Sequence, residues 1–144
     1  MFASILRSTM AVVLALAAAM AIIIAVEGIG AIMHPFPPGF DPTDMEACKA
    51  HVARYPTAAL IMGVVGWGLA VFASAWIATR LGAGRHPAHG ITIGLLLLAA
   101  AGYNMLMLPY PLWFEIANLV VFPAAFLIAA QLGRRQMVPN VPVA

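Results

Sequence analysis

The sequence predicts an all-α polytopic membrane protein with four transmembrane helices arranged as two hairpins. Hydrophobic residues make up 64% of the 144-residue chain and charged residues only 8%, whereas a soluble domain carries about 25% charged residues. Four apolar segments reach the length of about 20 residues that crosses a hydrocarbon core of about 30 Å. They cover residues 8–33, 57–79, 88–108 and 112–132. We therefore expect one transmembrane domain over residues 1–144 and no separate soluble domain.

The first apolar segment shares some features with a signal peptide. Arg7 precedes it, and Ala19-Met20-Ala21 loosely fits a cleavage site. Its apolar run is longer than the hydrophobic region of a signal peptide and continues past that site through three isoleucines. We interpret this segment as an uncleaved first helix.

The outer loop, residues 34–56, begins with a proline-rich strap. Pro35, Pro37 and Pro38 prevent a helix over residues 34–40 and favour a stiff extended chain. Phe36 and Phe40 give this strap apolar surface that we expect to be buried against the helix bundle.

A short amphipathic helix should follow the strap, from about Pro42 to Arg54. Asp41 before Pro42 fits an N-cap with proline at the first helical position, and Thr43 with Glu46 offers a competing capping box. One side of this helix carries an apolar stripe at spacings of three and four, formed by Met45, Cys48, Val52 and Tyr55. The helix should lie over the bundle and bury Met45 and Val52.

Small residues four positions apart predict where the long helices touch, because they let backbones approach closely in lipid. The second helix has the longest such ridge, made of Gly66, Ala70, Ser74 and Ala78. Shorter candidates are Ala17, Ala21 and Ala25 in the first helix, Gly90, Gly94 and Gly102 in the third, and Ala125 and Ala129 in the fourth.

The positive charges predict the orientation. Four crossings place five arginines on one side, namely Arg7, Arg80, Arg85, Arg134 and Arg135. By the positive-inside rule this side faces the cytoplasm. The opposite side carries the acidic residues Asp41, Asp44 and Glu46. We expect a multi-pass protein of the bacterial inner membrane with both the N- and C-termini cytoplasmic.

Polar residues inside the apolar segments are the candidates for a functional site. Glu27 lies about 30 Å of helical rise from Arg7, and Glu115 about 28 Å from Arg134, so both carboxylates sit near the outer edge of the hydrocarbon. Asn104 and Asn118 sit about one turn deeper, and His34 is nearby in sequence. A carboxylate at membrane depth is costly and usually marks a function or a specific pairing. The candidate ligand-binding residues are Glu27, His34, Asn104, Glu115 and Asn118.

Several functions are compatible with this cluster. Carboxylates above amides can bind a cation, hydrogen-bond a lipid headgroup or move a proton. The plainer interpretation is that the glutamates meet water at the interface while the asparagines pair between helices. We favour a protein that binds a membrane lipid or a small apolar ligand at this cluster, or that serves as an accessory subunit. Its expected partners are membrane lipid, a small apolar ligand, and either further copies of itself in a homo-oligomer or a larger membrane complex. The alternative is an intramembrane acid-base enzyme or a proton-coupled carrier that uses Glu27 and Glu115.

Other chemistries find less support. Asp44, Cys48 and His51 share one side of the outer helix and are ligand types that suit zinc, but Cys48 also belongs to the apolar stripe and no fourth ligand is in register, so we expect no metal site. No lysine lies within a span, and we expect no cofactor. The single cysteine excludes an intrachain disulfide. The positive residues follow topology, so nucleic acid is not an expected partner.

Three motifs give the chain a family resemblance. They are Glu27-Gly28, then His34-Pro35-x-Pro37-Pro38-Gly39-x-Asp41, then Asn104-x-x-x-Leu108-Pro109-x-Pro111-x-Trp113-Phe114. With these motifs the chain resembles an uncharacterised family of small bacterial four-helix integral membrane proteins. The resemblance covers most of the chain and implies the four-helix fold, but no activity, cofactor or partner.

Overall fold

The computed structural model describes residues 1–134 and is helical, as predicted. Its elements are α1 (Phe2–Met33), α2 (Met45–Val52), α3 (Thr57–Leu81), the short 3-10 helix η1 (Ala83–Arg85), α4 (Ala88–Met107) and α5 (Leu112–Gly133). Four of these helices, α1, α3, α4 and α5, are long and apolar enough to cross a membrane. Their bounds agree with the predicted spans within two residues, except that α1 begins at Phe2 rather than Ser8. No glycine or proline precedes Ser8, so nothing stops the helix there.

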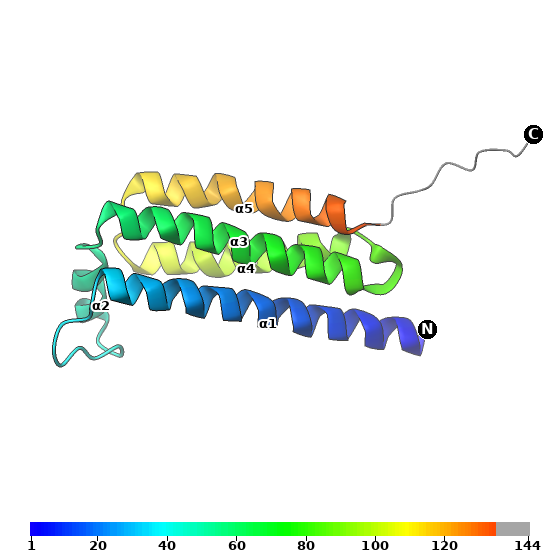
Figure 1. Cartoon of the computed structure of the whole chain (residues 1–144), viewed down its shortest axis with the longest axis horizontal. Helices are drawn as coiled ribbons and strands as arrows, with labels where there is room; N and C mark the ends of the chain where they lie inside the picture. The colour runs from blue at the N-terminus through cyan, green and yellow to red at the C-terminus, as the bar shows by residue number, and fades with distance from the viewer. Residues whose placement is uncertain (135–144) are drawn as a thin grey trace, which may run out of the picture.

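The four long helices lie side by side and share one long direction (Figure 1). The N-terminus, η1 and the end of α5 lie at one end of the bundle, while α2 and the α4–α5 turn lie at the other. At the first end, Arg7 Nε donates a hydrogen bond of 2.7 Å to the carbonyl oxygen of Leu81. Of the five arginines that were predicted to share one end of the bundle, the four within residues 1–134 do so. Arg135 and the C-terminus lie outside the described residues.

Helix α3 is the centre of the bundle and packs against α1, α4 and α5. All four members of its predicted ridge, Gly66, Ala70, Ser74 and Ala78, are buried. Their small side chains allow neighbouring helices to come close. A Cβ added at Gly90 of α4 would meet the side chain of Thr79 and the backbone of Ala75, so glycine is required for the close approach of α4 to α3.

The predicted packing stripe of α1 is wrong. Ala17, Ala21 and Ala25 are exposed, whereas the buried alanines of α1 are Ala11, Ala15 and Ala19. This alanine-rich helix offers several stripes of small residues, and spacing alone does not select the one that meets α3. Gly102 of α4 is likewise unpacked, with open space where its Cβ would be.

The core is closed in the half of the bundle nearer the N-terminus. One cluster joins α3 to α5 through Val71, Ala75, Phe122, Phe126 and Ala129. A second cluster joins α1, α3 and α4 through Ala15, Ala78 and Ile93. Toward the opposite end, α1 and α4 no longer meet in such a cluster, and a cavity described below lies between them.

The outer loop forms the predicted helix, but later than expected. Asp44 caps α2 by accepting hydrogen bonds from the backbone N–H groups of Glu46 and Ala47 at 2.9 and 3.3 Å. Asp41 instead accepts two hydrogen bonds from Thr43, which form a turn before the helix. The helix therefore starts at Met45 rather than at Pro42, because the residue that caps it is Asp44 and neither of the two predicted caps, Asp41 and Thr43.

The expected burial of the loop's apolar side chains is only partly correct. Val52 is buried and Phe40 is half-buried, but Phe36 is 50% exposed and Met45 is 42% exposed. Phe36 packs one ring face on His51, with ring centroids 4.5 Å apart, rather than inserting between the long helices. Met45 is the first residue of α2, at the exposed start of the helix.

Candidate functional site

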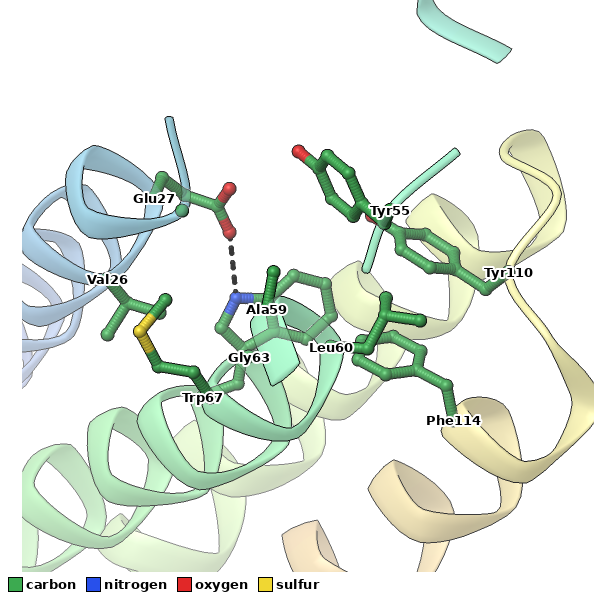
Figure 2. A pocket seen from close by; sticks show the side chains of 11 residues that line it. Val26, Glu27, Tyr55, Ala59, Leu60, Gly63, Trp67, Tyr110 and Phe114 are labelled. Atoms are coloured by element: carbon green, nitrogen blue, oxygen red, sulfur yellow. Dashed lines mark hydrogen bonds between the residues drawn. The ribbon is translucent and has the colours of Figure 1, made fainter. Parts of the chain in front are cut away.

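Glu27 is held by a partner from a different helix. Trp67 of α3 donates its indole N–H to Glu27 Oε1 of α1 at 3.0 Å (Figure 2). The indole nitrogen is a donor only, and a hydrogen bond to a charged acceptor is stronger than a neutral one. This contact therefore ties the carboxylate to α3, although Glu27 as a whole remains exposed on the side of α1.

Aromatic rings surround the far side of this carboxylate. Glu27 and Trp67 line a small cavity together with Tyr55, Tyr110 and Phe114. Its volume is about 20 Å³, counted as the space that the centre of a water-sized group can occupy. Trp67 meets Phe114 edge-on with ring centroids 5.5 Å apart, and Tyr110 stacks on Phe114 at 4.6 Å. Figure 2 shows the two tyrosines across the cavity from Glu27. We call these four aromatic residues, with Glu27, the aromatic cage.

The two phenols of the cage are electrically linked to Glu27. Burial raises the pKa of Tyr110, and the negative charge of Glu27 and the proximity of Tyr55 raise it further. The pKa of Tyr55 is also raised, first by burial and then by Glu27. Both hydroxyl groups therefore stay protonated at neutral pH.

A larger cavity begins at the same two residues and extends into the bundle. This cavity has a volume of about 320 Å³. It lies between α1 and α4, in the halves of these helices that are nearer α2, and over α3. Its lining is mostly apolar, with Ile23 from α1, Val71 from α3, Leu97 and Ala100 from α4, and Phe122 from α5. The polar residues that line it are Glu27 and Asn104. We call this cavity the α1–α4 groove.

Asn104 has an unused acceptor. Its Oδ1 is buried and has no hydrogen-bond partner among residues 1–134. A buried acceptor without a partner costs about 1–3 kcal/mol. Because this atom has almost no accessible surface, a bound group in the cavity described above reaches it only if the Asn104 side chain rotates.

His34 belongs to an outer layer above the cage. Its ring stacks on His51 with centroids 4.3 Å apart and meets Tyr55 edge-on at 5.1 Å. Its Nε2 donates to the carbonyl oxygen of His51 at 3.3 Å. Burial, and then the positive charge of His34, lower the pKa of His51. His34 thus reaches the cage through Tyr55, a lining residue, rather than lining it.

Glu115 and Asn118 are in different surroundings from Glu27 and Asn104. Both are on α5, and neither lines the small cavity or the α1–α4 groove. Asn118 is fully buried, and its Nδ2 donates to the carbonyl oxygen of Phe114 one turn earlier at 2.9 Å. Glu115 is half-buried in the first turn of α5, where a negative charge is favourable. Equal depth does not determine which side of the bundle a residue faces.

Trp67 is a residue of the candidate site that the sequence analysis did not select, as are the other aromatic residues of the cage. It lies ten positions into α3, about 15 Å below the outer end of that helix, and so below the usual interfacial belt of aromatic residues. A tryptophan at that depth needs a partner for its N–H. That need, together with a glutamate in the preceding helix, could have indicated the pair.

The comparisons with known proteins add no relative. No protein-family model, no curated protein and no solved structure matches the chain. The function must therefore be argued from the site itself.

Proposed function

We propose that this protein binds a membrane lipid or similar amphiphile in the α1–α4 groove. The apolar chain lies along α3, between α1 and α4, and the polar end reaches Glu27 and Asn104. In the proposed orientation, in a bacterial inner membrane with both termini cytoplasmic, these residues are in the outer leaflet. The observation that carries the proposal is that one cavity combines a mostly apolar lining with two polar side chains at one end.

The size and chemistry of the groove support this function. Ligand pockets have volumes of about 300–1,000 Å³ and are mainly apolar with a few polar groups that orient the ligand. The groove, at about 320 Å³, is at the lower end of this range and suits one chain and its attachment point rather than a bulky molecule. The partnerless Oδ1 of Asn104 gives the ligand's polar end a hydrogen bond that the described part of the protein leaves unmade.

The closed inner half favours binding over transport. A carrier needs a polar path that continues through the membrane. Below the groove, the bundle is filled by Ala75, Phe126 and Ala129 in one cluster and by Ala78 and Ile93 in another. Two hydroxyl residues of α3 are buried in this half, Ser74 and Thr79. Ser74 donates its hydroxyl to the carbonyl oxygen of Val71, and the Thr79 Oγ1 has no hydrogen-bond partner among residues 1–134, so the two do not form a hydrogen-bonded path.

A retained ligand provides the test. Native mass spectrometry of the protein released from mild detergent should show a bound amphiphile. Ala100→Phe places a ring in the groove, while Leu95→Phe changes an exposed position of the same helix that does not line it. We expect Ala100→Phe to lower the bound fraction at least fivefold and Leu95→Phe to leave it unchanged. Equal retention by both variants would show that the ligand binds elsewhere.

A further inference from the structure

The polar end of the groove has a definite electrostatic character. Glu27 supplies a carboxylate, and Asn104 supplies a buried amide oxygen that has no partner among residues 1–134; both are hydrogen-bond acceptors. Neither the groove nor the adjoining cage has a lysine, arginine or histidine among its lining residues. The protein group that contacts Glu27 is the neutral indole of Trp67. The site therefore offers negative charge without a balancing cation of its own.

The aromatic cage strengthens this preference. The faces of Trp, Tyr and Phe rings attract a cation, and the attraction is stronger where the cation is desolvated. Tyr55, Trp67, Tyr110 and Phe114 all line the space beside Glu27. Because Tyr55 and Tyr110 stay neutral, they do not compete with Glu27 for charge and can accept hydrogen bonds through their hydroxyl oxygens.

The size of the cage distinguishes between cations. About 20 Å³ is open to the centre of a water-sized group, and one water molecule needs on the order of 10–15 Å³ by the same measure. An –NH3⁺ group is about as large as water and fits. A trimethylammonium group is several times larger and does not fit within this space.

We infer that the groove selects amphiphiles whose headgroup is a primary ammonium. The –NH3⁺ group lies in the aromatic cage, between Glu27 and the four rings, and the chain lies in the groove. This inference rests on the proposed function. Groove and cage share Glu27 and Trp67, so a ligand can occupy both at once. The ammonium can come from an ethanolamine phospholipid or from a free long-chain amine.

Trp67 is a natural reporter for this test. The chain has three tryptophans, and Trp76 and Trp113 are both exposed on the outside of the bundle. In the W76F/W113F variant, Trp67 alone reports contact with the groove. In a W67F/W76F variant, Trp113 alone reports the surrounding lipid. Both variants are placed in nanodiscs of phosphatidylcholine with a minor fraction of chain-brominated lipid, which quenches indole fluorescence on contact.

The expected result is headgroup-selective quenching at Trp67. Brominated phosphatidylethanolamine should half-quench Trp67 at a mole fraction at least fivefold lower than brominated phosphatidylcholine does, whereas Trp113 should not distinguish them. Glu27→Gln keeps an oxygen for the Trp67 N–H but removes the charge, so it should abolish the selectivity. Hexadecylamine should relieve the quenching. If hexadecylamine relieves quenching while the two lipids quench Trp67 equally, the free amine is the source of the ammonium.

Two outcomes would overturn the inference in distinguishable ways. Equal quenching by both lipids, unaffected by hexadecylamine but reduced by Ala100→Phe, would show that the groove binds chains without selecting the headgroup. The proposed function would then stand and the ammonium would be wrong. Quenching of Trp67 that is unchanged by Ala100→Phe would contradict both.

Discussion

Asn104 and Asn118 are two asparagines at similar depth whose surroundings differ. Each has an Oδ1 without a hydrogen-bond partner among the described residues, but only Asn104 lines the α1–α4 groove. We therefore expect the two to respond differently to replacement by leucine, which has a similar volume. Asn104→Leu should weaken amphiphile binding about tenfold, since it removes one hydrogen bond to the ligand worth about 1.4 kcal/mol.

Asn118→Leu serves as the matched control. It should leave binding unchanged and alter the free energy of unfolding by no more than about 1 kcal/mol, because the loss of the bond to Phe114 is offset by removal of a partnerless acceptor. Binding titrations and denaturant unfolding of the two variants would check this. A large loss of binding in Asn118→Leu would place the ligand against α5 instead.

His51 makes the outer loop sensitive to pH. It is buried between the rings of Phe36 and His34, and its Nε2 has no partner within residues 1–134. Its pKa is lowered from 6.5 in the folded state, so the unfolded loop binds more protons. The loop's stability is therefore complete above about pH 6.5 and declines as the pH falls through the folded-state pKa.

His51→Phe should remove this decline, because phenylalanine keeps a ring in the stack but does not titrate. Hydrogen exchange of the amides in residues 34–55, corrected for the intrinsic effect of pH, would measure it. His86→Gln, which changes an exposed histidine at the opposite end, should retain the wild-type pH dependence. If the stability of the loop declines with falling pH in His51→Phe as it does in the wild type, the group that takes up the proton is not His51.

At the scale of the elements, glycines of α4 decide how closely it approaches α3. Gly90→Ala should lower the free energy of unfolding by about 1–3 kcal/mol, because the new Cβ meets Thr79 and the backbone of Ala75. Gly102→Ala, in the same helix, adds a methyl group in open space and should be neutral or stabilising by up to about 1 kcal/mol. Unfolding in mixed micelles would compare them. Equal effects would show that the α3–α4 contact does not depend on Gly90.

The elements also show what the sequence can predict. The spans of α3, α4 and α5 follow from apolar length and from the prolines around them, and the ridge of α3 was identified because only one stripe of small residues runs along most of it. For α1, many alanines provide several equivalent stripes, and the buried one depends on the partner helix. The start of α2 was misplaced because Asp41, Thr43 and Asp44 can all cap a helix, and the competition is decided by the turn that precedes it.

The candidate site was predictable in depth but not in direction. Rise per residue placed Glu27 and Asn104 near the same level, and both line the α1–α4 groove. It placed Glu115 and Asn118 at that level too, yet these residues line neither cavity. Which side of a helix faces which neighbour depends on the packing around α3. The aromatic cage depends on the same packing, because its residues come from α1, the outer loop, α3, the α4–α5 turn and α5.

For the whole molecule, the orientation in the membrane can be tested with the single cysteine. Cys48 lies in α2, at the end of the bundle opposite the N-terminus (Figure 1). In spheroplasts, a membrane-impermeant maleimide should label Cys48 from outside. A cysteine placed at exposed His86 in a C48S background should react only after the membrane is opened. The reverse pattern would invert the proposed topology and move the groove to the inner leaflet.

The position of a bound chain tests the central claim most directly. Phospholipids with a diazirine in mid-chain, bearing ethanolamine or choline headgroups, can be photo-crosslinked to the protein in nanodiscs and the adducts mapped by mass spectrometry. If the α1–α4 groove binds an amphiphile, adducts should concentrate on Ile23 and on residues 97–101 and be lost in Ala100→Phe. Adducts confined to exposed positions outside the groove, such as Leu14 and Leu119, and unchanged in Ala100→Phe would contradict the claim.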